Sequence, residues 1–141
     1  MPPASLDEVE RAVRAGDIDR AATLAADAAR AGLRHPLVFN LLAHVAEQRF
    51  DYAAAAKHLQ DGLRLDPRDP SLLTSLGMCL AKLERRPEAV AAFKTALDLA
   101  PDFPGALNGL AENLTALGHS EAALGFYQRA AQVAQIGRAH V

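Results

Sequence analysis

The sequence predicts an all-α protein, a solenoid built from four helix-pair repeats. Half of the residues are hydrophobic, and most of these are Ala and Leu, a composition that favours helix over strand. Two ladders share a 34-residue period: Pro2, Pro36, Pro70 and Pro104, and Ala21, Ala55, Ala89 and Ala123. Such self-similarity is the signature of a repeat architecture. We therefore assign residues 1–135 to the solenoid and divide it into repeats one to four, at residues 2–35, 36–69, 70–103 and 104–137, of which the last is incomplete.

Each repeat is expected to hold two helices of three to four turns. Proline is common in the first turn of a helix, because the N–H groups of that turn have no hydrogen-bond acceptor within the helix. The proline ladder therefore predicts four helix starts. A break near the middle of each repeat is predicted at 16–17, 50–51, 84–87 and 118–120. The last helix is expected to run from Glu121 to about Ala134.

Apolar spacing in repeat three fits a packed helix pair. Leu73, Leu76, Gly77 and Leu80 lie at i, i+3, i+4 and i+7, which is one stripe of a helix. On the second helix, a stripe that faces the first is predicted at Ala89, Phe93 and Ala96.

These residues, with Pro101, resemble the tetratricopeptide repeat family. Repeats two and four fit the pattern with small deviations, whereas in repeat one Ser5 and Glu8 replace expected apolar residues. Repeat one is therefore expected to be degenerate and to act as a polar terminal cap. The resemblance implies a right-handed α-solenoid of antiparallel helix pairs, whose concave groove binds a protein or peptide partner.

In this family the first helix of each repeat lines the groove. Matching places nominate the partner-binding residues Asn40, His44, Glu47, Thr74, Ser75, Met78, Lys82, Asn108 and Glu112, and also Leu41. Because Asn40, Thr74 and Asn108 are equivalent, they predict a ladder of hydrogen-bonding groups suited to an extended peptide. The alternative is that these are simply solvated groups. The family's clamp for a terminal carboxylate is disfavoured, because the matching places lack Lys and Arg.

Other functions find little support in the sequence. A formal charge of −2 without a basic run disfavours nucleic acid, and the lack of a long apolar run disfavours a membrane and favours the cytoplasm. His44 and Glu47 alone are too few ligands for a metal. The remaining histidines, His35, His58, His119 and His140, are expected to be solvated, and Cys79 to be buried and inert. We expect no cofactor and no catalytic residue, so this chain is not predicted to be an enzyme.

The carboxyl terminus is unusual. Residues 136–141 are the translation of ATC GGA AGA GCA CAC GTC, part of a common sequencing adapter, so we expect an artefact there and a natural protein that continues beyond Gln135. Two readings remain open. One is an interaction scaffold. The other is the amino-terminal array of a larger enzyme, since the composition is similar to bacterial arrays fused to sulfotransferase or glycosyltransferase domains. Exposed apolar residues also predict weak self-association, around Leu117, Leu124 and Phe126.

Overall fold

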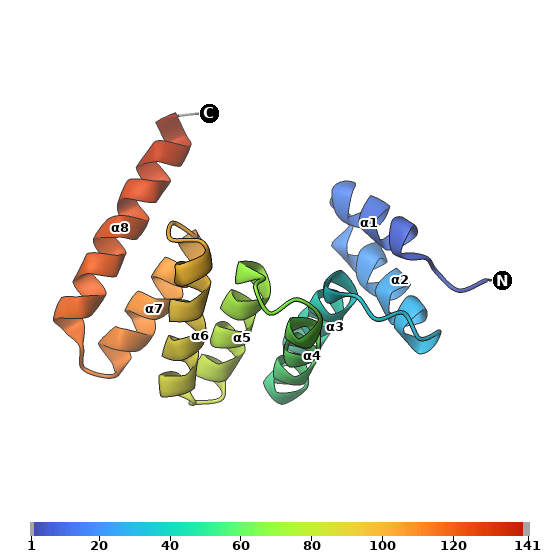
Figure 1. The fold of residues 1–141 in the computed structure, drawn as a ribbon, viewed down its shortest axis with the longest axis horizontal. Coiled ribbons are helices and arrows are strands. Elements are labelled where there is room, and N and C mark those ends of the chain that lie inside the picture. The colour runs from blue at the N-terminus through green and yellow to red at the C-terminus, as the bar shows by residue number, and fades with distance from the viewer. Residues whose placement is uncertain (1, 140–141) are drawn as a thin grey trace. The chain divides into compact units, whose positions relative to one another are not determined.

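The computed structural model describes residues 2–139, and within that range the chain forms eight α-helices and no strand (Figure 1). The helices are α1 (Leu6–Arg14), α2 (Ile18–Arg30), α3 (Pro36–Gln48), α4 (Tyr52–Leu65), α5 (Pro70–Lys82), α6 (Arg86–Leu99), α7 (Pro104–Ala116) and α8 (Ser120–Ala139). The all-α prediction is confirmed.

The helices pack as hairpins of sequence neighbours, in two compact modules. The N-terminal module, up to Pro67, holds the pairs α1–α2 and α3–α4, with α3 packed on α2. The C-terminal module, from Arg68 onward, holds α5–α6 and α7–α8, with α7 packed on α6. Within each hairpin the two helices run in opposite directions (Figure 1). The helix-pair prediction is confirmed.

Proline marks three helix starts but not the fourth. Helices α3, α5 and α7 begin at Pro36, Pro70 and Pro104, as predicted. The prediction for Pro2 is wrong, because α1 begins at Leu6. The start is fixed by a capping box, in which the Glu8 N–H donates to Ser5 Oγ at 3.2 Å and the Ser5 N–H donates to a Glu8 carboxylate oxygen at 3.4 Å.

His35 also caps a helix. Its Nδ1 accepts a hydrogen bond of 3.1 Å from the Leu37 N–H at the start of α3, so it is not the merely solvated side chain that we expected. His58 is half-buried and His119 is exposed, whereas His140 lies outside the described residues.

The breaks within the repeats fall where the sequence predicts them. One residue in each repeat has a left-handed backbone at this break, with φ of 77°, 60°, 61° and 88° at Gly16, Phe50, Glu84 and Gly118. Each of these residues lies one repeat period after the one before it, so the backbone geometry repeats even where glycine is absent.

The last helix is longer than predicted. It continues past Ala134 to Ala139, because residues 135–139 contain no proline and a single glycine is tolerated inside a helix. This stretch includes most of the predicted adapter sequence; His140 and Val141, its last two residues, lie outside the described range.

Each module has its own core. In the N-terminal module, buried side chains gather from α1, α2 and α3, including Val9, Val38 and Leu41. Leu41 is only 6% exposed, so its predicted place on a groove surface is wrong: it packs inward. In the C-terminal module Phe93 is fully buried and Cys79 is 1% exposed, which confirms the buried thiol.

Candidate functional site

Most of the predicted partner-binding residues reach the surface. On α3, Asn40, His44 and Glu47 are half-buried. On α5, Ser75 is half-buried, Met78 is 54% exposed and Lys82 is exposed, and on α7 both Asn108 and Glu112 are exposed.

The predicted residues on the neighbouring helices α5 and α7 are here called the α5–α7 face: Ser75, Met78, Lys82, Asn108 and Glu112. On each helix they follow helical spacing, at i, i+3 and i+7 on α5 and at i and i+4 on α7. The helices approach closely at Gly105, where an added Cβ would lie 3.1 Å from Cγ2 of Thr74. Glycine at this place therefore allows the start of α7 to lie close to Thr74 of α5.

Thr74, like Leu41, is buried and so differs from the other eight predicted residues. It is 6% exposed, and its Oγ1 has no hydrogen-bond partner among the described residues. The other three threonines donate their hydroxyl to the carbonyl four residues earlier: Thr23 to Asp19, Thr95 to Ala91 and Thr115 to Ala111. The ladder predicted from Asn40, Thr74 and Asn108 thus has a buried middle member.

A polar contact between α6 and α7 escaped the sequence analysis. Asn113 is 3% exposed, and its Nδ2 donates to the Gly109 carbonyl at 2.7 Å. Its Oδ1 accepts from Arg86 Nη1 at 3.1 Å. The repeat itself indicated this contact. Asn113 stands one period after Cys79, which was expected to be buried, and a buried amide needs a hydrogen-bond partner. The contact fixes α7 on α6.

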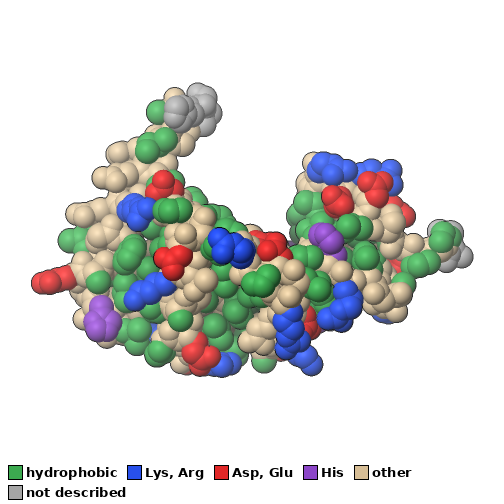
Figure 2. Space-filling model, in the orientation of Figure 1, with side chains coloured by type: hydrophobic (Ala, Val, Ile, Leu, Met, Phe, Trp, Pro, Cys, Tyr) green, Lys and Arg blue, Asp and Glu red, His purple; other side chains and the backbone are tan. Residues whose placement is uncertain are grey.

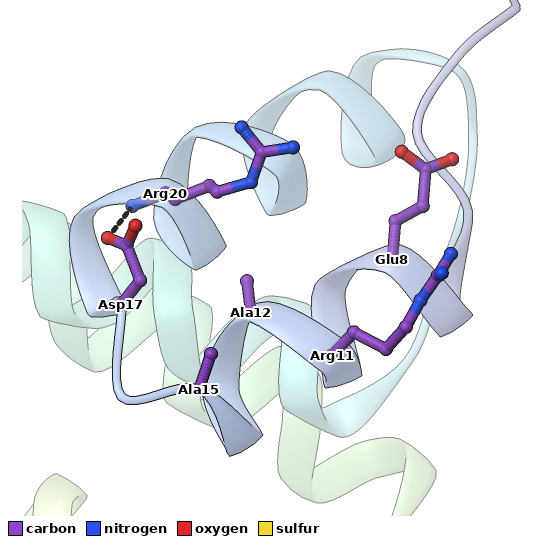
Figure 3. Close-up of a pocket in the computed structure, with 6 residues that line it drawn as sticks. All are labelled: Glu8, Arg11, Ala12, Ala15, Asp17 and Arg20. Carbon is purple, nitrogen blue, oxygen red and sulfur yellow. Dashed lines mark hydrogen bonds between the residues drawn. The ribbon is translucent and has the colours of Figure 1, made fainter.

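A hollow of about 330 Å³ opens between α1 and α2 (Figure 3). Ala12 and Ala15 form its floor, and the charged side chains of Glu8, Arg11, Asp17 and Arg20 surround it. Both carboxylates cap helices. Asp17 accepts a hydrogen bond of 3.0 Å from the Arg20 N–H, and Glu8 accepts one from the Ser5 N–H. Arg11 pairs with the exposed Asp7 at 3.3 Å.

The same hollow recurs three periods later in the C-terminal module, with different chemistry. Four of its lining residues, Leu114, Leu117, His119 and Ala122, match Ala12, Ala15, Asp17 and Arg20 in turn, and α6 adds Pro87, Val90 and Lys94. The volume is about 550 Å³ and the lining is mainly apolar. Hollows with matching residues thus lie in the first and fourth repeats, with charged side chains around the first and a mainly apolar lining in the second.

Charges are spread over the surface of each module. On the face in Figure 2, Lys and Arg side chains lie among acidic ones and form no basic stripe. Within residues 2–139, no three His, Cys, Asp or Glu side chains gather as metal ligands would. No helix of that range is long and apolar enough to cross a membrane.

Structural neighbours support the helical-repeat fold. A crystal structure of MamA superposes with a TM-score of 0.78 at 14% identity, covering 94% of this chain and 78% of that one. A second MamA structure gives 0.68 at 25% identity, with coverages of 86% and 72%. YrrB, described as a tetratricopeptide repeat protein with an unusual peptide-binding site, gives 0.73 at 22%, with coverages of 89% and 65%.

Sequence families agree with this fold. No curated protein matches the chain. Residues 39–140 match the family of the cilia and flagella-associated protein 70 middle TPR-like domain, and residues 6–70 match the tetratricopeptide repeat. The first match alone covers more than half of the sequence. The chain belongs to the tetratricopeptide repeat family.

Proposed function

We propose that this protein is an interaction module that binds a peptide segment of a partner on the first helices of its repeats, chiefly at the α5–α7 face. The observation that carries the proposal is Met78. Its side chain is 54% exposed in the middle of α5, in a row that is otherwise polar or charged. A flexible thioether adapts to varied apolar side chains, so it suits a surface that receives a partner.

The neighbours of Met78 supply polar contacts. Ser75 and Asn108 offer hydrogen-bonding groups to a peptide backbone, which needs partners along its length. Lys82 and Glu112 are exposed and oppositely charged, and neither forms an ion pair within the described residues. They would therefore favour peptides that carry matching charges. In the N-terminal module, Asn40, His44 and Glu47 on α3 are proposed as further contacts.

The likeness to YrrB supports a peptide ligand in general terms, because that protein is described as having a peptide-binding site. The matched families and neighbours give no support to an attached sulfotransferase or glycosyltransferase domain. The cytoplasmic location, the bacterial origin and the adapter tail stay predictions from the sequence.

A displayed peptide library tests the proposal. Peptides selected on the whole chain are synthesised, and their affinity is measured by fluorescence anisotropy. Ser75→Arg places a bulky charge on the α5–α7 face and should weaken binding at least about tenfold, a loss of about 1.4 kcal/mol. Ala91→Arg makes the same change at an exposed place on α6 and should leave the affinity unchanged. Equal affinities for the two variants would place the peptide elsewhere.

The contribution of the two asparagines is tested separately. Asn40→Ala and Asn108→Ala should each weaken a selected peptide several-fold, by removing one hydrogen bond worth about 1 kcal/mol. Unchanged affinity in both variants would exclude the hydrogen-bonding ladder and remove Asn108 from the proposed contacts; the rest of the α5–α7 face is tested by Ser75→Arg.

We also propose weak self-association through repeat four. Leu124 is 56% exposed and Leu117 is 39% exposed, whereas Phe126, which we expected to take part, is half-buried. Static light scattering over a range of concentrations should show a rising mean mass. A constant monomer mass would exclude self-association.

A further inference from the structure

The first turn of α7 lacks the side-chain cap that α3 and α5 have. At α5 the cap is Asp69, whose Oδ1 accepts hydrogen bonds of 2.9 and 3.2 Å from the N–H groups of Ser71 and Leu72. One repeat period later the cap position of α7 holds Phe103, and no side chain caps the helix. The two N–H groups of α7 that match those of Ser71 and Leu72 are therefore left without this acceptor.

These two N–H groups belong to Gly105 and Ala106, and neither donates a hydrogen bond to a described residue. They lie at the amino end of a 13-residue helix, where unpaired N–H groups and the aligned peptide dipoles attract negative charge. Gly105 is exposed, which gives a ligand access to the turn, whereas Ala106 is fully buried. Asp102, the acidic residue nearest in sequence, is paired with Arg129 at 3.3 Å, so its repulsion of an anion is reduced.

A buried hydroxyl lies beside the same turn. The side chain of Thr74 on α5 points at Gly105: its Cγ2 would lie 3.1 Å from an added Cβ, and no other described atom outside α7 is within 4 Å of that place. Thr74 is 6% exposed, and its Oγ1, on the same Cβ as that methyl group, has no hydrogen-bond partner among the described residues. Because buried polar groups are nearly always paired, this hydroxyl indicates a partner that comes from outside the chain.

We propose that this turn binds the side-chain carboxylate of an Asp or Glu in the partner peptide. The α7 carboxylate site consists of Thr74, Gly105 and Ala106, whose hydroxyl and N–H groups can all donate to a group that only accepts. Repeat three shows that the geometry is suitable, because the carboxylate of Asp69 occupies the matching place at α5. This inference rests on the proposed peptide binding at the α5–α7 face and adds an acidic residue to the peptide.

The α7 carboxylate site is in line with the α5–α7 face. Gly105 precedes Asn108 by three residues and Glu112 by seven, so the three lie on one side of α7. Thr74 directly precedes Ser75 on α5. A peptide that contacts Ser75 and Asn108 would therefore pass the amino end of α7, where its acidic side chain reaches the site.

A phosphate fits this turn less well than a carboxylate. Phosphate groups in proteins are commonly held by Arg or Lys, whose cations pair with the phosphate oxygens. Arg129, which is held near the turn by Asp102, is already paired with that acid. The carboxylate is also the group that the repeat itself binds in this position, at Asp69.

Amide NMR signals of the ¹⁵N-labelled whole chain test the site without a peptide. Acetate is the probe, and chloride keeps the ionic strength constant. The Gly105 and Ala106 signals should shift as acetate is added, whereas the Ser71 and Leu72 signals should stay in place, because Asp69 already accepts from their N–H groups.

Three outcomes of this titration would overturn the proposal. If acetate moves none of these signals, water is the only partner of the α7 turn. If acetate moves the signals of both helices equally, the shifts report a general effect of the salt. If inorganic phosphate at the same ionic strength binds more tightly than acetate, the site takes phosphate instead.

Variants at the cap position test the site with a peptide, by fluorescence anisotropy. Phe103→Ser supplies a hydroxyl that can accept from the N–H groups of the turn without adding charge, so it competes with the peptide carboxylate. It should weaken a selected acidic peptide at least about fivefold, the effect of losing one hydrogen bond. Phe103→Leu cannot cap and is the matched control, which should bind like the wild type. Equal affinities for the two variants would contradict the use of these N–H groups.

The hydroxyl is tested by a second matched pair. Thr74→Val should weaken the acidic peptide several-fold, whereas Thr74→Ser keeps the hydroxyl and should keep most of the affinity. Circular dichroism confirms that each variant folds. If Lys82→Ala removes the preference for an acidic peptide and Thr74→Val does not, the acidic residue binds Lys82 and the proposed site is wrong.

Changes in the peptide identify which carboxylate binds. Replacing its acidic residue by the matching amide should weaken binding about tenfold, because hydrogen bonds to a charged acceptor are about twice as strong as neutral ones. Amidation of the peptide's carboxyl terminus should have no effect. The opposite pattern would assign the site to a terminal carboxylate.

Failure of this inference and failure of the proposed function are distinguishable. If Ser75→Arg weakens a selected peptide whose affinity does not depend on an acidic residue, the peptide site stands and the carboxylate site is wrong. If Ser75→Arg leaves the affinity unchanged while acetate still shifts the Gly105 signal, the α7 turn binds carboxylates and the peptide lies elsewhere.

Discussion

The ring of Phe93 and the backbone of Gly109 are so close that a Cβ on the glycine would lie 2.4 Å from ring atom Cζ. The ring cannot move away from Gly109, because a Cβ added to Gly77 on its other side would lie 2.8 Å from the ring. Two helices of neighbouring hairpins, α6 and α7, meet at this contact. The glycine therefore sets how closely one hairpin stacks on the next.

Gly109→Ala should destabilise the protein. The methyl group must displace a buried ring, at a cost of about 1–3 kcal/mol in the free energy of unfolding, which exceeds the gain in helix propensity. Urea denaturation measures the change. Gly125→Ala is the control, because nothing lies within 4 Å of its added Cβ, and it should stabilise by up to about 1 kcal/mol. A neutral Gly109→Ala would mean that the ring is free to move.

Phe50→Gly should stabilise the protein even though it removes an aromatic ring. Phe50 has a φ of 60° and is 79% exposed, so it bears backbone strain and contributes little packing. Relieving the left-handed strain should raise the free energy of unfolding by about 1–2 kcal/mol. About half of this gain is lost because glycine makes the unfolded chain more flexible. We expect a net gain of about 0.5–1 kcal/mol in thermal or urea unfolding. Phe50→Ala keeps the strain and should show no gain; equal stability of the two variants would contradict the strain argument.

Thr74→Val should also stabilise. It replaces a buried hydroxyl that has no partner in the described structure with a methyl group of similar size. Removing an unsatisfied polar group recovers about 1 kcal/mol. Thr95→Val, on the exposed side of α6, loses a hydrogen bond to Ala91 and should be neutral or slightly destabilising. A clear loss of stability in Thr74→Val would show that the hydroxyl binds a group or water.

The pKa of the Glu88 carboxyl should be lower than that of an ordinary glutamate. Its hydrogen bonds from Arg85, with distances of 3.0 and 2.5 Å, lower the pKa of the Glu88 carboxyl, and the charge of Arg85 acts in the same direction. Because the folded pKa is lowered, the pair favours the folded state at pH above the ordinary glutamate range, and the effect is lost as pH falls through the folded pKa. An NMR titration of the side-chain carboxyl checks this. In Arg85→Ala the pKa should rise to the ordinary range, and an unchanged value would contradict the pairing.

The sequence predicts the period, the helix pairs and the core because these follow from local spacing. The repeat ladders place Phe93 inside and prolines at three helix starts, and the structure agrees. The helix start predicted at Pro2 is wrong because the capping box of Ser5 and Glu8 determines where α1 begins, and it outweighs the preference of proline for the first turn. That signal was present in the sequence as Ser-x-x-Glu.

The surface was harder to predict, because exposure depends on how closely neighbouring helices approach. Thr74 is buried at the place where α7 presents Gly105 to α5, and the sequence pattern of α5 alone does not reveal this. The contact of Asn113 with Arg86 spans 27 residues and likewise depends on the packing of α7 on α6. Met78, by contrast, is exposed on the predicted surface of α5.

Met78 also gives the most direct test of peptide binding at the α5–α7 face. The chain has two methionines, Met1 and Met78, so a spectrum of the protein labelled with ¹³C at the methionine methyl groups contains two signals. Titration with a selected peptide should shift the Met78 signal to saturation, at the concentrations that saturate fluorescence anisotropy, while the Met1 signal stays in place. A peptide that binds tightly without moving the Met78 signal would contradict the proposed site.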